Sequence, residues 1–160
     1  MLKDGCGQHE VAAGVAGEIV ASEVVSSDAV GGDVRVGPDY FIEKDGFRYA
    51  GGHLLLDLWG ASNLTDPPGV EAALCEAARA SGATILHAHV HQFGEGGGVS
   101  GVIVLAESHI SIHTWPERDF AAVDIFMCGA CDPRLAVPVL RRAFRPAIVK
   151  LTEHRRGLVE

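Results

Sequence analysis

No stretch of this 160-residue sequence is long and apolar enough to cross a bilayer, which takes about 20 consecutive apolar residues. The first residues, Met1 to Gly5, lead into glycine and polar residues and lack the compact apolar stretch of a secretory signal. Basic residues are also scarce, with 13 Lys and Arg against 21 Asp and Glu. These absences argue against a membrane protein and against a nucleic-acid surface, which needs clustered basic side chains. We therefore expect a cytoplasmic protein.

Cysteine is scarce as well, and the four present are Cys6, Cys75, Cys128 and Cys131. A cytoplasmic chain of this size rarely relies on disulfides. We therefore consider each cysteine as a core residue, a metal ligand or a reactive group. Cys75 falls on the apolar side of a predicted helix and is expected in the core, while Cys6 is expected to be inert. Cys128 and Cys131 form a CxxC motif, which suits a redox pair or half of a zinc site.

The N-terminal part of the chain differs from the rest. Residues 1–45 are rich in Gly, Ala, Val and Ser with weak periodicity, so we assign them to an extension of unknown role. Because 48% of all residues are hydrophobic, the remainder can build a real core. We expect residues 46–160 to form one domain.

Hydrophobic periodicity and turn residues predict six strands, at residues 53–59, 83–93, 99–106, 109–115, 120–128 and 146–152. Helices are predicted to open at residues 66–69 and 132–133, and Pro138 inside the second predicts a kink or a late start. Consecutive strands with short turns pair antiparallel, and the helices cover one face. We therefore expect an α+β two-layer sandwich with a mainly antiparallel sheet. Its second sheet face is expected to be apolar and to mediate self-association.

Chemically active side chains gather in the second half of the chain. Ser108 and His109 lie between two apolar runs, and His113 shares a strand face with His109 because the two are four residues apart. The predicted sheet brings a serine, histidines, an acid and a cysteine onto neighbouring strands. Such a set can provide the nucleophile and the base of covalent catalysis. Buried, hydrogen-bonded serine and histidine residues are also common in proteins that have no such chemistry.

Alternating histidines on one strand allow a different interpretation. His87, His89 and His91 share a face and, together with the CxxC motif, could bind a metal ion. They could equally face solvent or a partner subunit.

Several motifs resemble the prokaryotic S-adenosylmethionine decarboxylase proenzyme family. They are residues 98–101 (GVSG), 107–109 (ESH), 115–117 (WPE) and 121–129 (AAVDIFMCG). The resemblance extends over roughly residues 52–157 and leaves the N-terminal extension unexplained.

The resemblance implies that the chain cuts itself between Glu107 and Ser108. Ser108 Oγ would attack the carbonyl carbon of Glu107 and turn the peptide bond into an ester. Loss of the α-proton of residue 108 then expels the Glu107 carboxylate, and the dehydroalanine left behind releases ammonia to become a pyruvoyl group. His113 matches the family's residue for proton transfer in this processing, and Ser100 matches a serine that assists it.

The same resemblance implies the roles in decarboxylation. The pyruvoyl ketone would condense with the substrate amine as a Schiff base and serve as the electron sink, so that no external cofactor and no metal is expected. Cys128 matches the proton donor, Glu117 an acid that contacts the ribose hydroxyls, and Phe93 an aromatic that stacks on adenine.

The expected function is conversion of S-adenosylmethionine to its decarboxylated form plus CO2, for spermidine and polyamine synthesis. The expected assembly is a homodimer of processed protomers, with two β chains (residues 1–107) and two α chains (residues 108–160). The glycine-rich loop 94–97, with Glu95 beside Phe93, supports an alternative substrate, L-ornithine or L-arginine, which would give putrescine or agmatine. A remoter alternative is a non-catalytic relative that binds zinc or a small ligand.

Overall fold

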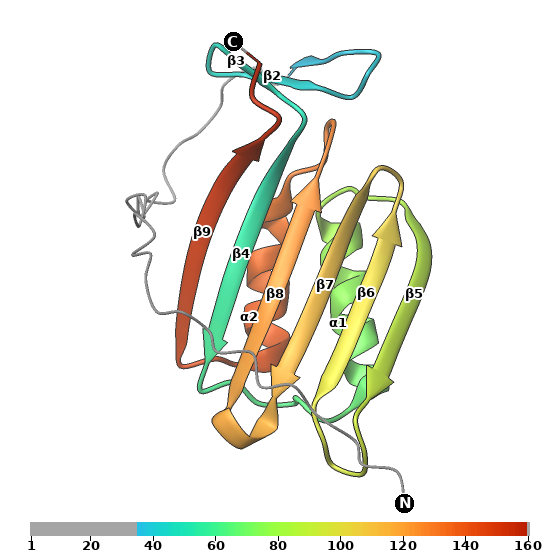
Figure 1. Cartoon of the computed structure of the whole chain (residues 1–160), viewed down its shortest axis with the longest axis vertical. Helices are drawn as coiled ribbons and strands as arrows, with labels where there is room; N and C mark the ends of the chain where they lie inside the picture. Colours follow the sequence, from blue (N-terminus) through green and yellow to red (C-terminus); the bar gives the residue numbers. More distant parts are fainter. Residues whose placement is uncertain (1–34, 160) are drawn as a thin grey trace, which may run out of the picture.

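The computed structural model describes residues 35–159, and its main element is a six-stranded antiparallel sheet (Figure 1). The strands are β4 (Gly51–Trp59), β5 (Ile85–Gln92), β6 (Val99–Leu105), β7 (Ser108–Trp115), β8 (Phe120–Met127) and β9 (Ile148–Arg156). Their order across the sheet is β5-β6-β7-β8-β4-β9. All six predicted strands are present.

Two helices, α1 (Pro67–Ala80) and α2 (Ala136–Phe144), cover one face of this sheet (Figure 1). Their apolar sides and the inward side chains of the strands form one buried cluster that includes Leu74, Phe144 and Ile110. The predicted α+β two-layer sandwich with helices on one face is confirmed.

Proline and glycine positions explain where the helices begin and end. Pro67 and Pro68 occupy the first turn of α1, where an amide N–H has no intrahelical acceptor, and Gly82 follows its end at φ +79°. A 3-10 turn, η2 (Pro133–Leu135), precedes α2, which starts only at Ala136. Pro138 therefore lies in the first turn of α2, and the predicted late start is confirmed.

Side chains alternate along β7 between the helix-covered face and the opposite face. Ser108, Ile110, Ile112 and Thr114 are buried against the helices, whereas His109, Ser111, His113 and Trp115 belong to the other side, which we call the open face. No helix of the described residues covers the open face (Figure 1).

The open face carries both aromatic and polar side chains, and the expectation of an apolar second face was wrong. Aromatic rings gather at one end, where the ring centroid of Phe120 lies 4.3 Å from that of Trp59 and 5.3 Å from that of Trp115. Polar groups occupy the other end, where His53 Nε2 lies 3.5 Å from Asp124 Oδ1. Alternation in strands identifies a buried face, but the second face of this sheet combines both kinds of residue.

A second, three-stranded sheet lies beyond the end of the large one (Figure 1). It consists of β1 (Arg35–Val36), β2 (Ile42–Lys44) and β3 (Phe47–Tyr49), and we call it the small sheet. The predicted boundary between residues 45 and 46 falls in the turn that joins β2 to β3. Most of the predicted extension, including Cys6, lies outside the described residues.

Sequence reasoning missed the small sheet because strands of two or three residues carry no periodicity. One local signal was available. Asp45 and Gly46 both have positive φ, +54° and +77°, as the type I′ hairpin turn requires, and Asp-Gly is a preferred pair there.

Among the described residues, no helix is long and apolar enough to cross a membrane.

Candidate active site

A tight hairpin between β6 and β7 carries the predicted cleavage point. Leu105 pairs with Ser108, so that only Ala106 and Glu107 form the turn. Glu107 has φ +64°, in the left-handed region that residues other than glycine seldom adopt, at a cost of about 1 kcal/mol or more. The peptide bond predicted to break follows this strained residue directly.

Ser108 is held in one place by a neighbouring strand. Its side chain is 8% exposed and lies on the helix-covered face. Its Oγ accepts a hydrogen bond of 3.0 Å from the backbone N–H of Cys128, the residue that follows β8. β7 and β8 are antiparallel. The start of β7, which carries Ser108, therefore lies beside the end of β8, which Cys128 follows.

The Cys128 thiol lies in surroundings that disfavour a thiolate. Burial raises its pKa most, the negative charge of Glu107 and the neighbouring Cys131 raise it further, and the hydrogen bond with Ser108 lowers it. The pKa of Cys131 is raised by burial and by Glu107 too. At neutral pH Cys128 therefore carries its proton, as a proton donor must.

A second pair of candidates lies at the other end of the same two strands. Ser100 on β6 pairs directly with His113 on β7, and Ser100 Oγ lies 2.7 Å from His113 Nδ1. Both side chains belong to the open face, and His113 is exposed. The ring centroid of Trp115 lies 6.1 Å from that of His113.

The two predicted substrate-binding residues lie at this second end. Phe93 directly follows β5, is 61% exposed, and meets the His91 ring edge-on with a centroid distance of 4.9 Å. Glu117 lies in the short 3-10 turn η1 (Pro116–Arg118) that follows β7, and it is exposed.

The predicted site residues thus form two groups. Glu107, Ser108 and Cys128 meet at one end of the sheet, which we call the Ser108 end. Ser100 and His113 meet at the other, which we call the His113 end. Ser108 and His113 are five positions apart along the extended strand, about 16 Å, and their side chains lie on opposite faces. One protomer does not bring the two groups together.

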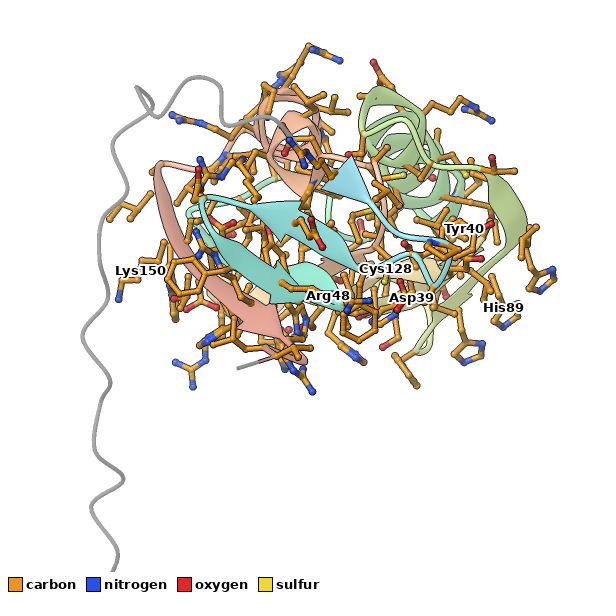
Figure 2. The ribbon with its side chains drawn as sticks, turned by 90° about the horizontal axis from the view of Figure 1, so that it is seen from above. Asp39, Tyr40, Arg48, His89, Cys128 and Lys150 are labelled. Carbon is orange, nitrogen blue, oxygen red and sulfur yellow. The ribbon has the colours of Figure 1, made fainter. Side chains whose placement is uncertain are left out.

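The structure adds neighbours to Cys128 that sequence reasoning did not identify. Figure 2 views the molecule from the end with the small sheet and shows Cys128 beside the segment that carries Asp39 and Tyr40. The backbone N–H of Gly129 donates a hydrogen bond of 3.2 Å to the carbonyl oxygen of Tyr40. The small sheet is therefore attached to the loop that follows β8.

The alternative of a metal site gains no support. His87, His89 and His91 are exposed on the edge strand β5. No group of three or more His, Cys, Asp or Glu within residues 35–159 is arranged to hold a metal ion.

Known proteins share this fold. The solved structure of adenosylmethionine decarboxylase from Aquifex aeolicus VF5 matches with a TM-score of 0.64 and 33% identity, over 70% of this chain and 94% of that one. The chain therefore has the sandwich fold of a decarboxylase.

Sequence comparison makes the assignment specific. The family model of S-adenosylmethionine decarboxylase matches residues 52–157, and the chain belongs to this family. The S-adenosylmethionine decarboxylase proenzyme of Methanococcus maripaludis strain C5 is 43% identical over 113 residues, which cover 69% of this chain and 92% of the relative. The proenzyme of Thermomicrobium roseum is 43% identical over 110 residues, 68% of this chain and 95% of the relative. The small sheet lies outside the matched range.

Proposed function

We propose that this chain is a self-processing, pyruvoyl-dependent decarboxylase that converts S-adenosylmethionine to decarboxylated S-adenosylmethionine and CO2, a reaction that supplies spermidine and other polyamines. The observation that carries the proposal is the contact between Ser108 and Cys128 next to the strained Glu107, in a chain of this family. The relatives above are named proenzymes, which fits self-processing. Their names also favour S-adenosylmethionine over ornithine and arginine.

Cleavage would begin at Ser108. Its Oγ attacks the carbonyl carbon of Glu107, the amide nitrogen of residue 108 leaves that carbon, and an ester replaces the peptide bond. The left-handed conformation of Glu107 favours this step, because breaking the bond releases the backbone strain. The hydrogen bond from the Cys128 amide keeps Oγ in a fixed position beside the turn.

Elimination would then need a base to remove the α-proton of residue 108. The ester breaks, the Glu107 carboxylate leaves, and hydrolysis with loss of ammonia gives a pyruvoyl group. His113, whose Nδ1 lies 2.7 Å from Ser100 Oγ, is the residue we assign to this proton transfer. Ser100 orients the imidazole.

Residues at the Ser108 end fit the prosthetic group that this cleavage would leave. A pyruvoyl ketone at position 108 supplies an electron sink for decarboxylation. Cys128 then delivers a proton to the carbon that has lost CO2, and its raised pKa keeps that proton available at neutral pH. Phe93 and Glu117 would hold the adenine ring and the ribose hydroxyls.

A homodimer would complete the site. Two open faces can pack about a two-fold axis that lies parallel to the sheets and across the strands. This symmetry places the Ser108 end of one protomer against the His113 end of its partner. The aromatic cluster of the exposed Trp59 and Trp115 and the half-buried Phe120 supplies apolar area for such packing. Each processed dimer would contain two α chains (residues 108–160) and two β chains (residues 1–107).

The test is CO2 release by the purified, self-cleaved protein, with S-adenosylmethionine, L-ornithine and L-arginine assayed side by side. We expect two fragments on a denaturing gel and turnover of S-adenosylmethionine. Turnover of ornithine or arginine alone would overturn the substrate and leave the processing chemistry standing. An uncleaved chain without CO2 release would overturn the whole proposal.

A further inference from the structure

The proposed function uses only one cysteine of the Cys128–Cys131 motif. The two residues are the first and last of a four-residue turn, which the Cys131 N–H closes by donating to the Cys128 carbonyl oxygen at 3.4 Å. Such a turn keeps its first and fourth Cα atoms within about 7 Å, and most disulfides have Cα separations of about 4.4–6.8 Å. Gly129, at φ +62°, supplies the conformation that the turn needs.

Both thiols are free, and the turn holds the two residues near each other. Cys128 and Cys131 are free thiols and are each partly exposed. They interact electrostatically, since Cys131 contributes to raising the pKa of Cys128.

The small sheet holds this turn from the outside. Gly129 donates its N–H to the Tyr40 carbonyl oxygen at 3.2 Å, and the side chains of Tyr40 and Val36 border the Gly129 Cα. These contacts come from residues that precede the range matched by the family model. They keep the turn, and with it the two thiols, in place.

A cavity gives a small oxidant access to the turn. It has a volume of about 90 Å³ and lies between the small sheet and the loop after β8, with Tyr49, Gly129 and Cys131 in its walls. A water molecule occupies about 30 Å³, so a peroxide-sized molecule fits in this cavity beside Cys131.

We propose that Cys128 and Cys131 form a reversible disulfide that switches the decarboxylase off when a peroxide oxidises the pair. The minor thiolate form of one cysteine attacks an oxygen of hydrogen peroxide, the O–O bond breaks, and the departing hydroxide takes up a proton, which gives a sulfenic acid and water. Because burial raises the pKa of both cysteines, this step is slow at neutral pH and speeds up as the pH rises. The second thiol attacks that sulfur, the S–S bond forms and another water leaves, so that two thiols are oxidised and one peroxide is reduced. Cys128 in the disulfide has no proton to deliver. This inference rests on the proposed role of Cys128 as proton donor.

Self-cleavage makes the disulfide easy to detect. Both cysteines belong to residues 108–160, whereas Cys75 and Cys6 belong to residues 1–107. After treatment with hydrogen peroxide, we expect the mass of the α chain to fall by about 2 Da, the mass of two hydrogens. A peptide linking Cys128 to Cys131 should appear in the digest. CO2 release should fall at least tenfold and return after treatment with dithiothreitol.

Two variants separate the switch from general oxidative damage. Cys131→Ser should release CO2 within about twofold of the wild-type rate before oxidation, because Cys131 has no assigned part in the reaction. After peroxide it should show no 2 Da loss, and dithiothreitol should not restore it, because unprotected Cys128 passes to the sulfinic acid. Cys75→Ser is the matched control and should behave as the wild type.

The outcomes distinguish the two proposals. An α chain of unchanged mass after peroxide, or a disulfide that leaves CO2 release intact, would overturn the switch. If the reduced protein releases no CO2 at all, the proposed function fails, while a digest of the α chain, or of the uncut chain, still shows whether the peptide linking Cys128 to Cys131 forms.

Discussion

The two ends of strands β6 and β7 each hold a serine beside a second reactive side chain, yet their surroundings differ. At the Ser108 end, the serine is buried, bonded to a backbone N–H, and adjacent to a strained residue and a protonated thiol. At the His113 end, Ser100 is bonded to an exposed imidazole on the open face. Burial and bonding partners, rather than residue type, therefore distinguish the serine proposed as the nucleophile from the serine proposed to position a base.

The largest expected effect comes from removing the nucleophile at the Ser108 end. Ser108→Ala should abolish both cleavage and CO2 release, because the attacking oxygen is lost. A denaturing gel measures the first and the decarboxylase assay the second. Ser111→Ala on the open face of the same strand is the control and should cleave normally. Cleavage of the Ser108→Ala chain would assign the nucleophile elsewhere.

Mixed dimers test whether the two ends work together across protomers. His113→Ala alone should slow cleavage by about 10²–10⁴-fold, the usual contribution of a general base. When it is co-expressed with Ser108→Ala, the intact Ser108 of one protomer meets the intact His113 of the other. The His113→Ala chain should then be cut and CO2 release should return in part. If an isolated mixed dimer is not cut and releases no CO2, the whole site lies within one protomer.

A loss confined to turnover is expected at Cys128. Cys128→Ala should leave cleavage largely intact and lower the rate of CO2 release by about 10²–10⁴-fold, since protonation of the carbanion loses its donor. Cys75→Ala, also a half-buried cysteine, should change neither. Wild-type turnover in Cys128→Ala would make the proton-donor assignment wrong.

The smallest effect is a shift in pH dependence. Burial, and then the charge of Glu107, raise the pKa of Cys128, so Glu107→Gln should lower that pKa. A thiol with a lower pKa loses its proton at a lower pH, so the alkaline fall of kcat should move to lower pH. Glu76→Gln on α1 is the control. An unchanged profile would show that Glu107 does not influence the donor.

The sequence predicted the main sheet and both helices because their signals are local. Alternating residues marked strands such as 109–115, and the Asp-Pro pairs at residues 66–67 and 132–133 marked helix starts. The small sheet was missed because its strands are too short for periodicity, and only Asp45–Gly46 indicated a hairpin there. The left-handed Glu107 could not be foreseen, since glutamate has no preference for that conformation.

By itself, the sequence determined the order of the two helices and the six strands of the main sheet, and the motif residues that identify the family. These depend on residue type and on spacing along a few turns of chain. Only the tertiary structure decided that Ser108 contacts Cys128, that Ser100 and His113 lie about 16 Å away along the strand, and that Tyr40 holds the Cys128 turn. Each of these depends on strand register and on contacts between residues far apart in the chain, which no local spacing specifies.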